Sequence, residues 1–65
     1  MKVFAKLLKE KRKQAGLTQL EMANELKMTL YGYKSYEAGR RTPDLEAATR
    51  IAVILRVSLD ELVGI

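Results

Sequence analysis

The residue types that carry most enzyme and metal chemistry are missing from this chain. Its 65 residues include no histidine and no cysteine, so it cannot build an ordinary zinc site or a Ser-His-Asp or Cys-His nucleophile. Four carboxylates, those of Glu21, Glu25, Asp44 and Glu46, fall at helix starts and on exposed helix faces, and no glycine-rich loop could cradle a phosphate. We therefore expect no enzyme activity, no metal and no cofactor.

The chemistry that remains is the attraction of an unevenly placed positive charge. The formal net charge is +4, and the whole excess lies near the N-terminus, where Glu10 is the only acid among six basic residues. These basic residues are Lys2, Lys6, Lys9, Lys11, Arg12 and Lys13. Arg40 and Arg41 form a second basic pair. Such a surface can simply be solvated, or it can attract nucleic acid or an anionic membrane surface, and charge alone does not choose.

Membrane association is the weakest of these readings. The longest apolar run, Ile51–Leu55, is too short to cross a bilayer. The apolar stripe of the N-terminal helix is already used by packing inside the domain, which leaves little for a membrane surface. The N-terminus also lacks the features of a signal peptide, so we expect a cytoplasmic protein with no membrane partner.

Residues typical of helix starts and helix ends divide the chain into five predicted helices, and no strand is predicted. Gly16 ends the first helix, whose inward residues we expect to be Phe4, Leu7, Leu8 and Ala15. Capping boxes open the second helix at Thr18-Gln19-Leu20-Glu21 and the fifth at Ser58-Leu59-Asp60-Glu61. Thr29 caps a third helix over about 30–37, which ends at Gly39.

The fourth helix begins after the N-cap Asp44. Its apolar residues recur at helical spacing, so they should form one buried stripe. This stripe consists of Leu45, Ala48, Ile51, Ala52 and Leu55. We expect one all-α domain over residues 1–65, without a ligand-sensing segment and without a small-molecule ligand.

The second and third helices are separated by a very short connection. Because Lys27-Met28 leaves so little chain between them, the third helix must turn sharply away from the second, which is the geometry of a helix-turn-helix. On the third helix, spacing places Tyr33 and Tyr36 on one face, which we expect to be core. The opposite, outward face carries Leu30, Tyr31, Lys34 and Ser35.

These segments together resemble the Cro/cI-type (XRE-like) phage-repressor family of helix-turn-helix domains. The resemblance runs from about Phe4 to Val63 without an insertion. It is carried by Leu17-Thr18-Gln19, Glu21-Met22-Ala23, Leu26-Lys27-Met28-Thr29, Tyr36-Glu37-Ala38-Gly39-Arg40-Arg41-Thr42-Pro43 and Val57-Ser58-Leu59-Asp60-Glu61-Leu62. The family pattern places glycine where this chain has Lys27 and Arg56, so both residues are expected in the left-handed backbone region at a cost on the order of 1 kcal/mol each.

The resemblance implies a sequence-specific regulator of transcription, a repressor, whose third helix enters the major groove of double-stranded DNA. Carried over by position, the base-reading candidates are Leu30, Tyr31, Gly32, Lys34 and Ser35. The phosphate-contacting candidates are Gln19, Thr29, Arg40 and Arg41. Gly32 would allow close approach of the DNA. The outward face has no Gln, Asn or Arg, the commonest base readers.

The resemblance also implies a buried ion pair and a dimer. Arg12 and Glu37 fall where the family places an inward, structural pair. A homodimer would bind two half-sites, and its contact candidates are Val53, Ile54, Val63 and Ile65. The alternative is a protein-interaction module, antitoxin-like or a regulatory adaptor, that uses the apolar residues Leu20, Leu30 and Tyr31 to bind a protein. A DNA-binding protein of this kind could also be regulated by a protein partner, and the sequence leaves this possibility open.

Overall fold

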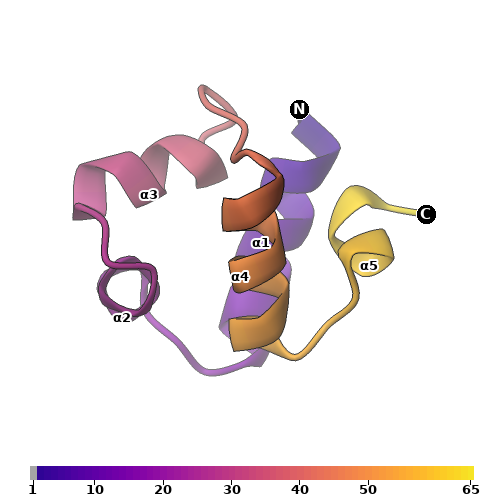
Figure 1. The fold of residues 1–65 in the computed structure, drawn as a ribbon, viewed down its shortest axis with the longest axis horizontal. Helices are drawn as coiled ribbons and strands as arrows, with labels where there is room; N and C mark the ends of the chain where they lie inside the picture. The colour runs from indigo at the N-terminus through magenta and orange to yellow at the C-terminus, as the bar shows by residue number, and fades with distance from the viewer. Residues whose placement is uncertain (1) are drawn as a thin grey trace.

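The computed structural model describes residues 2–65, with Lys2 by its backbone only; Met1, which the expected domain includes, lies outside them. Five α-helices follow one another, α1 (Lys2–Gln14), α2 (Gln19–Glu25), α3 (Leu30–Glu37), α4 (Leu45–Leu55) and α5 (Leu59–Val63). Residues 2–65 contain no strand, so the all-α fold is confirmed. In Figure 1, α2 is seen end-on and α3 runs across the view above it, which is the expected helix-turn-helix.

The predicted caps are present at the start of four helices. The Thr18 hydroxyl accepts the Glu21 backbone N–H at 3.0 Å, and the Glu21 carboxylate accepts the Thr18 N–H at 2.8 Å, which completes a capping box at α2. Ser58 and Glu61 repeat this arrangement at α5. Thr29 and Asp44 cap α3 and α4 with single side-chain bonds.

Two non-glycine residues take the left-handed backbone conformation, as expected. Lys27, in the turn between α2 and α3, and Arg56, at the end of α4, both have φ of 57°. These turns are sharp because the left-handed residue reverses the chain immediately after the helix. Their side chains therefore add strain that glycine would not.

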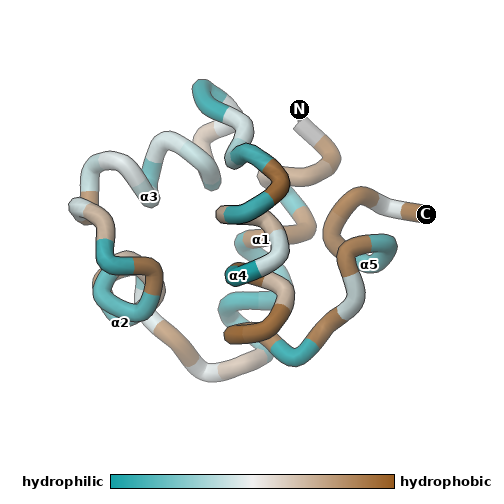
Figure 2. The backbone as a smooth tube through the Cα atoms, viewed as in Figure 1, coloured by the Kyte–Doolittle hydropathy of each residue, from teal (hydrophilic) through white to brown (hydrophobic). Residues whose placement is uncertain are grey.

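One core joins all five helices. Tyr33, Leu8, Met22, Ile51 and Leu62 are fully buried within it. Tyr33 and Tyr36 both lie in this core, as predicted, with their rings in edge-to-face contact 6.4 Å apart. The closest packing joins α2 to α3, and α1 to both α3 and α5. Figure 2 shows hydrophobic and hydrophilic positions alternating along α4, in keeping with a helix buried on one side.

Three expectations about the core were wrong in detail. Leu45 is the first residue of α4 and is 74% exposed, so the buried stripe begins later in the helix, with Ile51, Ala52 and Leu55. Ala15 is exposed because it follows the last residue of α1 and no longer keeps the helical phase. Ala5, which the predicted stripe omitted, is 6% exposed and belongs to the core.

Candidate nucleic-acid interface

The outward face of α3 is formed by three of the five predicted base-reading residues. Tyr31 is 72% exposed, Lys34 is exposed, and Leu30 is half-buried at the first helical position. The Thr29 hydroxyl accepts the Gly32 N–H at 3.1 Å, so the start of the helix is held by its cap. Tyr31 and Lys34 lie one turn apart, so they form a continuous outward surface.

The expected outward position of Ser35 is wrong. Its side chain is 2% exposed, and its hydroxyl donates to the Tyr31 carbonyl at 3.0 Å. The chain after α3 folds back over this flank, since the Ser35 carbonyl accepts the backbone N–H groups of Arg40 at 3.1 Å and Arg41 at 3.3 Å. A helical wheel places Ser35 correctly around the axis but does not show the turn that covers it.

Gly32 does not offer open space to DNA either. A Cβ at this position would lie 3.1 Å from Met28 Cε and 3.2 Å from Thr29 Oγ1, with Arg41 Nη1 at 3.6 Å. Gly32 is therefore covered by its neighbours' side chains. Because Gly32 has no side chain, the side chains of Met28, Thr29 and Arg41 can pack next to it. The expectation that Gly32 lets the DNA backbone or bases approach closely is therefore corrected.

The predicted ion pair between α1 and α3 is present and almost completely buried. Arg12 Nε donates to Glu37 Oε2 at 2.6 Å, and Arg12 Nη2 donates to Glu37 Oε1 at 3.2 Å. The two side chains are only 8% and 3% exposed. Arg12 Nη1 also donates to the Leu17 carbonyl at 2.8 Å, so the pair additionally holds the segment that leads into α2. This arrangement satisfies a planar guanidinium on two sides.

Glu37 is the acceptor at the centre of a larger network. It accepts bonds from Arg12, from the Tyr33 hydroxyl, and from Gln19 Nε2 at 3.1 Å. Burial alone would raise the pKa of Glu37, but these hydrogen bonds outweigh it and hold the pKa below its usual value. Burial, reinforced by the bond to Glu37, raises the pKa of Tyr33, so its hydroxyl stays protonated and continues to donate. Gln19 is thus positioned by the core pair.

A cationic hollow lies beside Gln19. It has a volume of about 320 Å³ and is lined by Lys9, Gln19, Lys34, Glu37, Ala38 and Arg40. It brings together a cation from α1, one from α3 and one from the following loop, so it suits a phosphate group. Lys9 was missed as a candidate from the sequence. Its place on the basic face of α1 is readable from the spacing, but its position against α3 depends on how the helices pack.

The two loop arginines lie along α3. The Arg40 guanidinium carbon is 5.9 Å from the centroid of the Tyr31 ring, and that of Arg41 is 5.5 Å from the Tyr36 centroid. Both distances are within the range of cation–π contacts. Arg41, close to Gly32, lies on a different flank of α3 from the Arg40–Tyr31 pair. The four predicted phosphate-contacting residues are therefore divided, with Gln19 and Arg40 at the cationic hollow and Thr29 and Arg41 close to Gly32.

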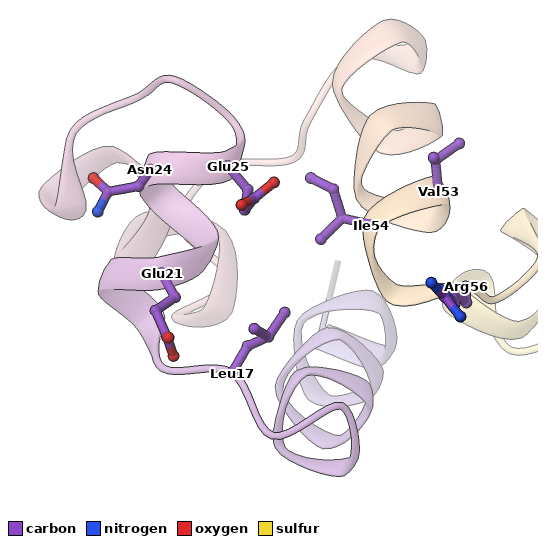
Figure 3. Close-up of a pocket in the computed structure, with 7 residues that line it drawn as sticks. All are labelled: Leu17, Glu21, Asn24, Glu25, Val53, Ile54 and Arg56. Carbon is purple, nitrogen blue, oxygen red and sulfur yellow. The ribbon is translucent and has the colours of Figure 1, made fainter.

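The predicted dimer-contact residues do not form one patch. Val53, 71% exposed, and the half-buried Ile54 line a groove of about 560 Å³ between α2 and α4. Figure 3 shows Glu25 and Ile54 reaching into this groove from its two sides, above Leu17. Val63 instead lines a smaller, largely apolar groove of about 300 Å³ next to Leu45. Ile65 is 91% exposed.

The described part of the chain has no cluster of three or more metal-binding side chains. None of its helices has the length and apolar character needed to cross a membrane.

Sequence comparisons agree with this architecture. A family model described as helix-turn-helix matches residues 8–62. The chain is 41% identical over 64 residues to the cryptic phage CTXphi transcriptional repressor RstR of Vibrio cholerae, an alignment that covers 98% of the chain and 56% of that relative. It is 47% identical over 60 residues to the uncharacterized HTH-type transcriptional regulator YqaE of Bacillus subtilis, covering 92% of the chain and 52% of that relative.

A third relative is the HTH-type transcriptional regulator ImmR of Bacillus subtilis, which is 37% identical over 61 residues, or 94% of the chain and 48% of ImmR. The chain thus spans about half the length of these relatives. No solved structure matches the chain.

Proposed function

This chain belongs to the Cro/cI-type helix-turn-helix family, and from that membership we propose that it binds double-stranded DNA sequence-specifically and regulates transcription as a repressor. The observation that carries the proposal is the cationic hollow beside the exposed face of α3. In this arrangement α3 enters the major groove while cations on either side of it neutralise phosphates. Under the same proposal the chain binds DNA without catalysing a reaction and works in the cytoplasm.

The exposed face of α3 supplies the contacts to bases. Lys34 can donate to guanine O6 and N7, and Leu30 can pack against a thymine methyl group. Tyr31, which is 72% exposed, can contact a base or a phosphate. Around them Lys9 and Gln19, which line the cationic hollow, offer donors to a phosphate on the groove edge.

We propose that the working form is a homodimer on two half-sites about 34 Å apart. A single domain of this size offers few base contacts, so two copies on one duplex raise both affinity and specificity. The exposed Val53 and Val63, the half-buried Ile54 and the exposed Ile65 are the candidate contacts, in two separate surfaces.

The experiment is a selection of random duplexes by the purified protein, followed by affinity measurements over a series of salt concentrations. A DNA-binding protein loses affinity steeply as salt rises, with a slope of about −0.9 per phosphate contacted. Lys34→Ala and Tyr31→Ala should abolish binding to the selected duplex while helical content and melting temperature stay nearly unchanged, because both side chains are exposed.

Arg50→Ala is the matched control. It also removes an exposed positive charge, but from α4, which contributes nothing to the cationic hollow. Its binding should stay close to that of the unmodified protein. If Lys34→Ala and Tyr31→Ala bind as well as Arg50→Ala does, the assignment of the recognition face is wrong.

A protein-interaction module is the second candidate, favoured by one apolar feature. Leu20, 53% exposed, and Leu30 both line a hollow of about 470 Å³ between the start of α2 and α3. A protein partner could bury these side chains against its own apolar residues. Salt-insensitive binding to a protein, together with no affinity for any duplex, would favour this candidate over DNA binding.

A further inference from the structure

The outward face of α3 lacks the side chains that most often read bases. Of its exposed residues only Lys34 carries a charged donor, and the face has no Gln, Asn or Arg of its own. Arginine is the commonest partner of guanine in the major groove because its planar fork matches O6 and N7 together. A lysine presents a single point charge and makes this distinction less well.

The loop after α3 brings an arginine to this face. The Ser35 carbonyl accepts both the Arg40 and the Arg41 backbone N–H, so the chain reverses against the last turn of α3. From there the Arg40 side chain reaches the Tyr31 ring, with its guanidinium carbon 5.9 Å from the ring centroid. Tyr31 lies near the N-terminal end of α3 and is 72% exposed, so the pair is at the outer surface of the helix.

Arg40 and Arg41 are adjacent in sequence but differ in their surroundings. Arg41 lies over Tyr36, which is 7% exposed, and has one guanidinium nitrogen close to Gly32, so it lies against the body of the domain. Arg40 lies over the exposed ring of Tyr31, and among residues 2–65 it forms no ion pair with a carboxylate. Its guanidinium is therefore available to a ligand.

We propose that Arg40, held on the ring of Tyr31, is a specificity-determining residue that reads a guanine in the major groove. This inference rests on the proposed function and differs from the phosphate contact that the family resemblance implies for Arg40. A free arginine loses rotamer freedom when it binds a base, but the ring already restricts Arg40. Tyr31 is the positioning residue for it. The loop thereby supplies the base-reading arginine that the outward face of α3 lacks.

The test compares base preferences with salt dependence. Random duplexes are selected with the unmodified protein and with Arg40→Lys, which keeps the charge but removes the fork. A preference for guanine at one position in each half-site should appear with the unmodified protein and be lost with Arg40→Lys, a change in discrimination of about 5- to 150-fold. The salt slope should change little, because the positive charge is kept.

Variants of Tyr31 test how Arg40 is held. Tyr31→Phe keeps the ring and should keep the preference for guanine, whereas Tyr31→Leu should lose it as Arg40→Lys does. In the free protein, nuclear magnetic resonance should show ring-shifted side-chain protons of Arg40 that persist in Tyr31→Phe and vanish in Tyr31→Leu. Arg41→Ala is the matched control: because Arg41 is a phosphate candidate, the substitution should weaken binding to all duplexes by a similar factor and leave every base preference intact.

Two results would overturn the inference, and they have different consequences for the proposed function. If Arg40→Lys keeps every base preference, and Arg40→Ala weakens all duplexes by the same factor while lowering the salt slope by about one, Arg40 contacts only a phosphate. In that case the proposed function survives. If the unmodified protein selects no duplex, the proposed function itself fails and the role of Arg40 in reading DNA fails with it.

Discussion

Replacing Arg12 by alanine should remove a large part of the stability of this domain. The substitution deletes both bonds to Glu37, at 2.6 and 3.2 Å, and the bond to the Leu17 carbonyl at 2.8 Å. Glu37 would then keep a buried negative charge with only Tyr33 and Gln19 as donors. Breaking one partner of a buried ion pair costs about 3–5 kcal/mol, and the two remaining donors favour the lower end of this range.

This loss is large compared with the total free energy of unfolding. A domain of this length has a free energy of unfolding of roughly 3–10 kcal/mol, at about 0.05–0.15 kcal/mol per residue. A loss of about 3 kcal/mol should lower the melting temperature by about 12–24 °C, since each kcal/mol corresponds to about 4–8 °C in domains of this size. The assay is urea and thermal unfolding followed by far-ultraviolet circular dichroism.

Acidification gives this prediction an internal check. The pKa of Glu37 is below its usual value in the native protein, so its contribution to stability is fully present above the unfolded value of about 4.3 and is lost as the pH falls through the lower folded value. Without Arg12 the strongest hydrogen bond that opposes burial is lost, so we expect the pKa of Glu37 to rise and its protonation to relieve the destabilisation. The deficit of Arg12→Ala should therefore shrink between about pH 7 and about pH 4.

Lys11→Ala is the control for this experiment. Lys11 precedes Arg12 in α1 and pairs with Glu61 at 3.7 Å, but the two side chains are 25% and 50% exposed. Solvent screens such a pair, so we expect only a small change in stability. Equal losses for Arg12→Ala and Lys11→Ala, or a deficit for Arg12→Ala that does not shrink on acidification, would refute the reasoning.

Three further predictions concern the turns, the last helix and the proposed dimer. Lys27→Gly and Arg56→Gly should each raise the free energy of unfolding by up to about 1 kcal/mol in urea titrations, because φ is 57° at both positions; a loss would contradict the proposed strain. Ser58→Ala should lower it by about 1 kcal/mol and speed amide exchange in α5; unchanged exchange would show that the cap is unimportant. Val63→Glu should shift sedimentation from dimer towards monomer with the fold intact; an unchanged sedimentation coefficient would exclude Val63 from the contact.

Local features of this fold were predictable because each depends on a few neighbouring residues. The hydroxyl and carboxylate caps at Thr18, Thr29, Asp44 and Ser58 satisfy backbone N–H groups within one turn, so the starts of four helices follow from short patterns. The short connection between α2 and α3 likewise forces their steep crossing. The family resemblance added the left-handed Lys27 and Arg56, and the pairing of Arg12 with Glu37 across 25 residues.

The amino-acid sequence by itself thus determined the five helices, the starts of four of them and the side of α3 on which Tyr31 and Lys34 lie. Only the tertiary structure decided which positions on that side are open. The backbone turn at Arg40 and Arg41 covers Ser35, Arg41 lies close to Gly32, and the packing of α1 against α3 brings Lys9 to the cationic hollow. Helical periodicity gives a direction around one axis, whereas burial and charge clustering depend on segments from elsewhere in the chain. The placement of Arg40 on Tyr31 is of this second kind.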